Sequence, residues 1–536
     1  MKHYISSITF LIFSIKLLAI TNVPPIKPTI IINLVLDNVS NEEIDRNSHL
    51  LTQDGLLKLR NEGSTFHNAY YPYASNDRAC DYASISTGTT PRYHGIVADK
   101  WLTNSKAKIE SSISNEQIHV LDSFSTKPGY NANKLRVTTI GDELKLNTMG
   151  KAKVFSVSLD KYASVLLGGH AANAAYWMDN KTGDWVTSSS YMEELPKWVN
   201  DFNEKKFSNF YLEQEWVLSG NITKSAIGEE AYSNHTFPLT LNNYIDEDFP
   251  YSIISSTPMG QLLVEDFTKE VIKNENLGKD DNTDILYINY SSITNPQIKT
   301  GKYSIEKADF LVRLDKSIAK LINYLDDEIG SHRYLIALTS TKQVGANVDE
   351  LKKYKIPTGY FNPTRAQALL NSYLMAVHGQ GNWILNIKNQ QIYLNKELIE
   401  KSHLNINDFS EQVALFMEEF SGIKWALPAS KLKYSDFKDE NFIAIQASYF
   451  PSRSGDIVLC YFPGWAEESK DKTSKYTYSH NNSAVPLMFY GWKTKRSNIN
   501  TKACITGLAP TLSTLINISI PNSSSKNQIF EELNEK

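Results

Sequence analysis

Short, continuous apolar runs recur along the chain and predict buried strands. Residues 29–36 (TIIINLVL) form the first run, which is rich in β-branched residues and ends at Asp37. A run that is apolar on both faces is typical of a central strand in a parallel sheet. Runs of the same kind predict further strands at residues 153–159, 284–290, 334–338 and 485–490.

Segments with helical periodicity separate these runs. Residues 50–61 repeat apolar positions at helical spacing and end before Gly63, and residues 309–325 are strongly amphipathic. A late helix is predicted at residues 509–516. Strands that alternate with helices predict an α/β fold with a central, mostly parallel sheet and helices on both faces.

Two regions interrupt the alternation of strands and helices. Residues 171–282 are rich in aromatic side chains and polar turns, and residues 343–439 mix Pro, Gly and short helical patterns. We expect both to be inserted cap regions of one domain that covers residues 29–523. The core of that domain is then predicted at residues 29–170, 283–342 and 440–523.

Composition and charge narrow the class of protein. Hydrophobic residues make up 41% and charged residues 21%, which is ordinary for a soluble globular protein. The formal net charge of -4 argues against nucleic acid as a partner, because no excess of cations is available for phosphate backbones. Cys80, Cys460 and Cys504 form no C-x-x-C pair, and the sequence leaves open whether two of them form a disulfide.

The N-terminus predicts a signal peptide over residues 1–20. Lys2 and His3 precede an apolar run over residues 5–18, and a polar, Pro-rich stretch follows it. This pattern indicates export to the periplasm or cell envelope, with an uncleaved anchor as the alternative. The run is short for a membrane span, so we expect none in the mature chain.

Polar residues follow the predicted strands at a shared edge. Asp37, Thr294 and Thr341 fall at or just beyond strand ends. Ligands of open α/β sheets bind at the carboxyl ends of the strands. A functional site is therefore expected there.

Long motifs around this edge carry a family resemblance. They are residues 84–96 (SISTGTTPRYHGI), 137–146 (VTTIGDELKL), 169–179 (GHAANAAYWMD), 195–203 (LPKWVNDFN), 452–465 (SRSGDIVLCYFPGW) and 508–515 (LAPTLSTL). With them the chain resembles the alkaline phosphatase superfamily, in particular single-chain phosphate-irrepressible bacterial alkaline phosphatases and nucleotide pyrophosphatase/phosphodiesterases. The resemblance implies the fold of that superfamily.

The resemblance also implies a mechanism with two zinc ions, which activate a Thr or Ser nucleophile and hold the phosphoryl oxygens. One implied zinc ligand, Asp37, is present. The other ligand positions lack a suitable donor and are Thr294, Ile298, Thr341, Lys342 and Ala484. Residues 285–305 and 333–348 contain no Asp, Glu, His or Cys, so a small shift of the alignment does not restore the ligands.

The implied nucleophile and phosphate-binding positions are replaced too. Arg78 stands at the nucleophile position, Asp99 at a family Asn, and Asp160 and Tyr162 at a Lys and an Arg. These losses predict an exported pseudoenzyme with no catalytic residues, no metal and no cofactor, which acts as a scaffold for protein–protein interaction, with another envelope protein as partner. The alternative is a phosphate-ester hydrolase, a phosphatase or phosphodiesterase, with a rebuilt site.

Several charged residues have competing interpretations. Arg78, Lys161 and Lys342 suit a basic pocket for an anionic ligand. Asp77 and Asp81 are expected in a solvated charged loop, with a new acid–base pair as the alternative. His94 and His170 are expected to be structural.

The retained carboxylate makes a specific prediction about its neighbours. Without metal, a buried Asp37 is costly unless it is paired or protonated. We therefore predict an ion pair between Asp37 and a replacement cation, Arg78 in preference to Lys342.

Overall fold

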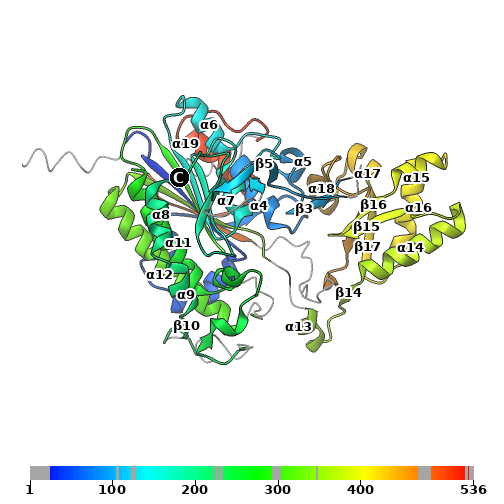
Figure 1. Cartoon of the computed structure of the whole chain (residues 1–536), viewed down its shortest axis with the longest axis horizontal. Helices are drawn as coiled ribbons and strands as arrows, with labels where there is room; N and C mark the ends of the chain where they lie inside the picture. The colour runs from blue at the N-terminus through cyan, green and yellow to red at the C-terminus, as the bar shows by residue number, and fades with distance from the viewer. Residues whose placement is uncertain are drawn as a thin grey trace, which may run out of the picture.

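The structure is a computed structural model that describes residues 25–529 apart from 104–107, 122–127, 221, 224–226, 228–232, 234, 292–297, 299–303, 344, 346–347, 469–483 and 525–528. It confirms the predicted α/β class. The main sheet has 11 strands in the order β21-β2-β20-β13-β1-β12-β7-β8-β9-β5-β6, and helices pack on it (Figure 1). The predicted signal peptide lies outside the described residues.

The centre of the sheet is parallel, as the apolar runs predicted. Strand β1 (Ile30–Leu36) lies between β12 (Asp284–Tyr290) and β13 (Tyr334–Ser340) and is parallel to both. Strand β7 (Val154–Ser158) pairs with β12 in the same direction. Because these four strands share one direction, their carboxyl ends meet at one edge of the sheet.

Antiparallel strands and further parallel strands extend this centre. Strand β20 (Val485–Gly491) pairs antiparallel with β13. The remaining strands of the sheet are β2 (Ser64–Tyr70), β5 (Ser114–Leu121), β6 (Pro128–Tyr130), β8 (Ala174–Met178), β9 (Trp185–Ser188) and β21 (Ser497–Cys504).

Two hydrophobic layers cover the faces of the sheet. Ile30, Ile32 and Leu34 of β1 belong to the layer that contains α11 (Pro258–Asn274) and α12 (Ile305–Glu328). Alternate residues of β1 belong to the opposite layer, with α4 (Arg78–Thr87) and α7 (Lys161–Gly168). This alternation is the two-residue period of a strand, and burial on both faces explains the continuous apolar run.

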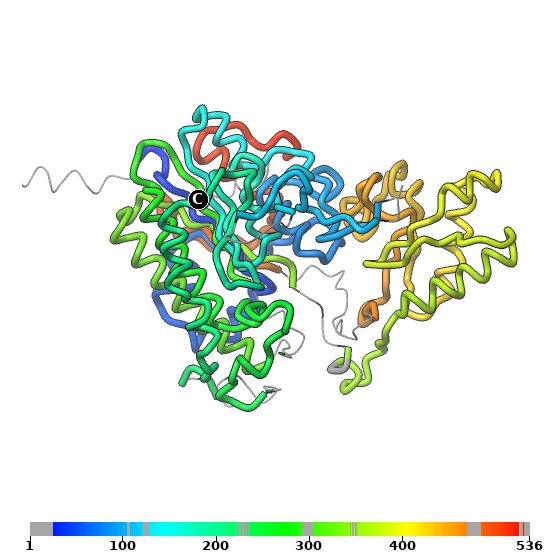
Figure 2. The backbone as a smooth tube through the Cα atoms, viewed as in Figure 1, coloured from blue at the N-terminus to red at the C-terminus, as the bar shows by residue number. Residues whose placement is uncertain are grey.

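A second lobe carries its own sheet and core. Strands β15 (Ile384–Lys388), β16 (Gln391–Leu394), β18 (Ile457–Tyr461) and β17 (Ile423–Pro428) form a 4-stranded sheet in that order. Helices α14 (Pro363–His378) and α16 (Ile406–Glu418) pack on it. Figure 2 shows this lobe, yellow to orange, to one side of the main sheet.

At two places, strands join a different sheet from the one that the expected division into core and insertions implies. Strands β8 and β9 lie in the range expected as the first insertion, and they pair with the main sheet. Strand β18 lies in the range expected as core, and it pairs with β16 and β17 of the second lobe. The sequence analysis predicted none of these three strands, because it assigned their ranges to insertion or core from composition alone.

The other elements connect these layers. The helices are α2 (Asn41–Arg46), α3 (Leu56–Glu62), α5 (Pro91–His94), α6 (Ile140–Asn147), α8 (Lys197–Glu204), α9 (Phe207–Leu212), α13 (Val348–Lys353), α15 (Lys396–Lys401), α17 (Ala429–Tyr434), α18 (Glu440–Ala447) and α19 (Leu508–Leu515). The short strands are β3 (Lys100–Leu102), β4 (Ile109–Ser111), β10 (Glu215–Trp216), β11 (Leu239–Thr240), β14 (Gly359–Phe361) and β19 (Trp465–Glu467). A search of the described helices finds no segment with the length and hydrophobicity of a membrane span.

Candidate functional site

Asp37 lies directly after β1, and its carboxylate is fully buried. The carboxylate accepts hydrogen bonds from the Tyr82 hydroxyl at 2.8 and 2.9 Å and from the Asn289 amide at 3.0 Å. The Arg78 guanidinium also donates to it, at 3.0 Å. Burial raises the pKa of the Asp37 carboxyl above its usual value, while the charge of Arg78 acts in the opposite direction. The predicted ion pair between Asp37 and Arg78 is present.

Arg78 is the first residue of helix α4 and lies beside Asp37. The side chain of Asp77 caps this helix by accepting a hydrogen bond from the Ala79 amide at 3.0 Å. One guanidinium nitrogen contacts Asp37, and the other lies 3.9 Å from a carboxylate oxygen of Asp160. The Arg78 side chain is 33% exposed, so solvent reaches it.

Asp160, Lys161 and Tyr162 follow strand β7. The Asp160 carboxylate caps helix α7 by accepting from the Tyr162 amide at 2.9 Å. The Lys161 ammonium donates to the Tyr130 hydroxyl at 3.0 Å and lies 4.3 Å from the centre of that ring. All three residues after β7 are half-buried. They bring a carboxylate and a cation to the same edge as Arg78.

Asp77 and Asp99 form a carboxyl pair beside Arg78. The Asp99 main-chain amide donates to the Asp77 carboxylate at 3.0 Å. Burial and the neighbouring charge of Asp77 raise the pKa of the Asp99 carboxyl well above its usual value. Both effects disfavour the ionised form, so Asp99 is the carboxyl of this pair that favours its protonated form. It supplies a proton donor at the site.

Lys342 belongs to a separate cluster. Its ammonium lies 3.6 Å from the Asp81 carboxylate and 3.9 Å from the centre of the Tyr73 ring. It also donates to the main-chain carbonyl groups of Tyr73 and Ser75. The side chain is only 9% exposed, so Lys342 presents little surface to a ligand.

The expectation of a solvated loop for Asp81 is wrong. Asp81 lies inside helix α4 and is 1% exposed. Its carboxylate accepts from the Tyr73 hydroxyl at 2.7 Å and from the Lys342 amide at 2.8 Å. Burial raises the pKa of this carboxyl, and the charge of Lys342 opposes that shift.

The other implied ligand positions supply no metal-binding side chain beside Asp37. The Thr341 hydroxyl accepts from the Asn38 amide at 3.0 Å, and Ile298 is packed in the hydrophobic core. Ala484 has no donor side chain, and Thr294 lies outside the described residues.

These residues do not fit the two zinc ions that the family resemblance implies. Zinc takes three or four N, O or S donors from protein and water. Among the residues that the structure describes, no group of 3 or more His, Cys, Asp or Glu side chains is arranged to hold a metal ion. The cation of Arg78 also stands against Asp37, where a metal would be repelled.

Both histidines bind framework partners. His94 is buried and lies 3.1 Å from the Ser84 hydroxyl, and burial lowers its pKa to about 3. His170 lies 2.8 Å from the Asp142 carboxylate, and that hydrogen bond raises the pKa of the imidazole. The three cysteines are free thiols.

Sequence reasoning missed two residues of the site, Tyr82 and Asn289. Tyr82 lies four positions after Arg78 on α4, so the two side chains share one face of the helix. Asn289 is a buried amide near the end of an otherwise apolar strand. A polar residue in such a strand was a usable signal for a partner of the strand-end carboxylate.

Comparisons with known proteins agree with the fold. The family model for type I phosphodiesterase / nucleotide pyrophosphatase matches residues 31–484. Alkaline phosphatase PafA of Elizabethkingia meningoseptica is 29% identical over 95% of this chain and 95% of its own length. Alkaline phosphatase PhoV of Synechococcus elongatus is 29% identical over 93% of this chain and 92% of its own. The crystal structure of wild-type PafA matches with a TM-score of 0.83 at 28% identity, over 94% of this chain and 98% of that one.

These similarities contradict the prediction of a non-catalytic scaffold. Relatives that match nearly the whole chain are named alkaline phosphatases, and the matching family model describes phosphodiesterases and pyrophosphatases. The findings favour an enzyme, which was the alternative interpretation. The prediction failed because it tested the residues against a single mechanism, and the absence of one set of groups does not exclude catalysis by another set.

Proposed function

Because the chain belongs to the type I phosphodiesterase / nucleotide pyrophosphatase family within the alkaline phosphatase superfamily, we propose that it hydrolyses phosphate esters with a rebuilt site. The observation that carries the proposal is the partly exposed side chain of Arg78, whose guanidinium the buried Asp37 holds at the shared edge of the parallel strands. Lys161, Asp160 and the Asp77–Asp99 pair complete the site.

Arg78 and Lys161 supply the groups that bind the phosphoryl oxygens. A guanidinium donates several hydrogen bonds in one plane and suits a phosphate well. The Asp37 carboxylate holds one edge of the Arg78 guanidinium, and Tyr82 and Asn289 in turn hold that carboxylate. The exposed part of the Arg78 side chain is therefore kept in a defined orientation. Pairing with Asp37 also neutralises the charge of a carboxylate that would otherwise repel the substrate.

The carboxyl groups supply the proton transfers. Water attacks phosphorus while the bond between phosphorus and the ester oxygen breaks. Asp160 accepts the proton of the attacking water, and the protonated Asp77–Asp99 pair gives a proton to the leaving oxygen. The products are the free alcohol and phosphate, and no step passes through a metal ion.

A direct assay tests this proposal. Purified full-length protein should hydrolyse p-nitrophenyl phosphate or bis-p-nitrophenyl phosphate, and Asp99→Asn should lower kcat by about 10²- to 10⁴-fold, the usual contribution of general acid catalysis. Asp436→Asn is the matched control, because this aspartate is exposed on the second lobe. Absence of hydrolysis of both esters, or equal rates for the wild type and Asp99→Asn, contradicts the proposal.

Export is proposed as well. Its support is the charged and apolar pattern of residues 1–20. Fractionation of cells should find the protein in the periplasm or envelope, and recovery in the cytosol with Met1 intact is the contrary outcome. Interaction with another envelope protein stays a prediction.

A further inference from the structure

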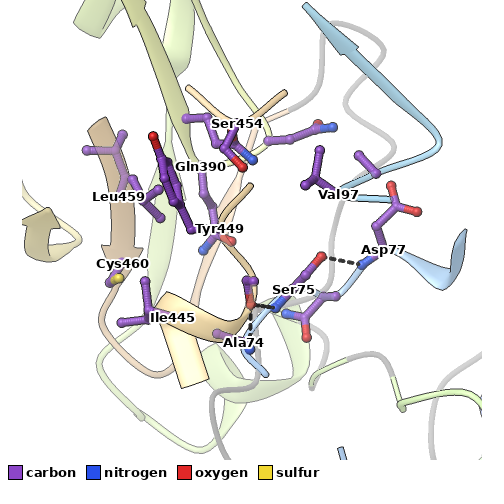
Figure 3. Close-up of a pocket in the computed structure, with 16 residues that line it drawn as sticks. Ala74, Ser75, Asp77, Val97, Gln390, Ile445, Tyr449, Ser454, Leu459 and Cys460 are labelled. Atoms are coloured by element: carbon purple, nitrogen blue, oxygen red, sulfur yellow. Dashed lines mark hydrogen bonds between the residues drawn. The ribbon is translucent and has the colours of Figure 1, made fainter. Parts of the chain in front are cut away.

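A cavity lies between the domain of the main sheet and the second lobe (Figure 3). Its volume is about 170 Å³. Residues 74–77 and 97–98 of the main domain form one wall. The other wall consists of residues 389–391, 445, 448–449, 454 and 458–460. Asp77 lines the cavity and also holds the amide of Asp99, so the cavity adjoins the proposed proton donor.

The wall of the second lobe presents a buried donor whose hydrogen-bonding capacity is unused. The Gln390 side-chain nitrogen is buried and has no hydrogen-bond partner among the described residues. Tyr449 is 3% exposed and lines the same wall, where its hydroxyl is a second polar group for a ligand. A buried donor without an acceptor costs free energy, and a bound ligand removes that cost.

Gln390 lies in a tight turn that borders the cavity. Asn389 and Gln390 have φ values of 52° and 61° and form the two-residue turn between β15 and β16. Gly and Asn are the residues that favour such a turn, so glutamine at its second position is not explained by the turn itself. A contact to a ligand accounts for it.

Charge and shape define the class of ligand. Asp77 is the one charged side chain among the residues that line the cavity in the described part of the chain, and no cation is among them. A negatively charged group is therefore disfavoured there. Val97, Ile445 and Leu459 add apolar surface, which suits the face of a ring.

We propose that this cavity binds the alcohol part of the substrate, and that this part is a neutral ring with several hydrogen-bonding groups, such as a sugar or a nucleoside. This inference rests on the proposed function only in that the bound alcohol is part of a phosphate ester. Binding of the free alcohol to the cavity does not depend on hydrolysis. The ring contacts the apolar wall, Gln390 donates to an oxygen of the ligand, and Tyr449 bonds to a second polar group. The ester oxygen then lies toward Asp77.

Calorimetry with free alcohols tests the cavity without any turnover. Glucose and cytidine are titrated separately into full-length wild type, Gln390→Met and Tyr449→Phe. Both substitutions keep the approximate volume and remove hydrogen-bonding groups. Tyr434→Phe is the control, since Tyr434 is 85% exposed on the same lobe and does not line the cavity.

At least one of the two alcohols should bind, and each cavity variant should bind it about 2- to 12-fold more weakly, the loss of one neutral hydrogen bond. The alcohol that binds identifies the sugar or the nucleoside as the source. No binding of either alcohol at roughly 10 mM, or equal affinity in wild type and both cavity variants, overturns the inference.

Kinetics separate this inference from the proposed function. The phosphate ester of the alcohol that binds should have a lower KM than ethyl phosphate, and Tyr449→Phe should remove most of that difference. Binding of the alcohol without hydrolysis of any ester overturns the proposed function and supports the cavity. Hydrolysis with equal KM values for the ring-bearing ester and ethyl phosphate overturns the assignment of the cavity.

Discussion

The two ion pairs at the carboxyl edge of the sheet differ in their access to solvent. Arg78 pairs with Asp37 and is 33% exposed, whereas Lys342 pairs with Asp81 and is 9% exposed. Arg78 keeps part of its guanidinium available, but Lys342 uses its donors on Asp81 and two carbonyl groups. Both residues are cations at positions where the family has site residues. Arg78 is nevertheless suited to binding a ligand, whereas Lys342 has a structural role.

Lys342→Met should have the largest effect on stability. The change leaves the Asp81 carboxylate buried without its cation, and breaking a buried pair from one side costs about 3–5 kcal/mol. Urea denaturation measures the free energy of unfolding, with Lys433→Met, an exposed lysine of α17, as the control. A loss no greater than that of the control contradicts the structural role.

Arg78→Ala should have a smaller effect on stability. Tyr82 and Asn289 continue to donate to Asp37, and solvent reaches the space that the partly exposed guanidinium leaves. We expect a loss of about 1–3 kcal/mol in the free energy of unfolding, the cost of an incompletely satisfied buried group. If Arg78→Ala lowers the free energy of unfolding by more than Lys342→Met does, the pair of Arg78 with Asp37 is the more important one for stability, contrary to this prediction.

The cost of Arg78→Ala should depend on pH. The pKa of Asp37 is raised in the folded state, so its contribution to stability is present below the unfolded pKa and is lost as pH rises through the folded pKa. Removing Arg78 raises that folded pKa further. The difference in unfolding free energy between wild type and variant should be larger at roughly pH 8 than at roughly pH 5. A constant difference means that the two groups are not coupled.

A chelator should have the smallest effect. The proposed reaction uses side chains of this chain and no metal, so EDTA should leave both kcat and Tm of the wild type unchanged. The control is a zinc-dependent phosphatase in the same buffer. Loss of activity that added zinc restores contradicts the site described above.

The sequence predicted the main features of the fold and one contact of the site. Strand β1 was predictable because burial on both faces leaves a continuous apolar run. The contact of Asp37 with Arg78 was predictable because a buried carboxylate needs a partner. The contact of Lys342 with Asp81 was not, since the burial of Asp81 depends on how α4 packs against the end of β13.

Whether the protein is an enzyme was harder to predict by comparing single residues with those of one family mechanism. Replacement of the residues of one mechanism predicted an inactive protein, and the named relatives contradict that prediction. The raised pKa of the Asp99 carboxyl depends on burial and on the closeness of Asp77, which lies 22 positions away in the sequence, and a motif reveals neither. For the same reason, no pattern indicated that residues 389–391 of the second lobe face Asp77.

Residues 73–75, which precede α4, are hydrogen-bonded from two sides. On one side, Lys342 at the end of β13 holds the carbonyl groups of Tyr73 and Ser75. On the other, the Ser448 hydroxyl accepts from the amides of Ala74 and Ser75 at 2.8 and 2.9 Å. The backbone that leads to Arg78 is thus held from both sides, so the position of that guanidinium depends on the packing of Ser448 as well as on the end of β13.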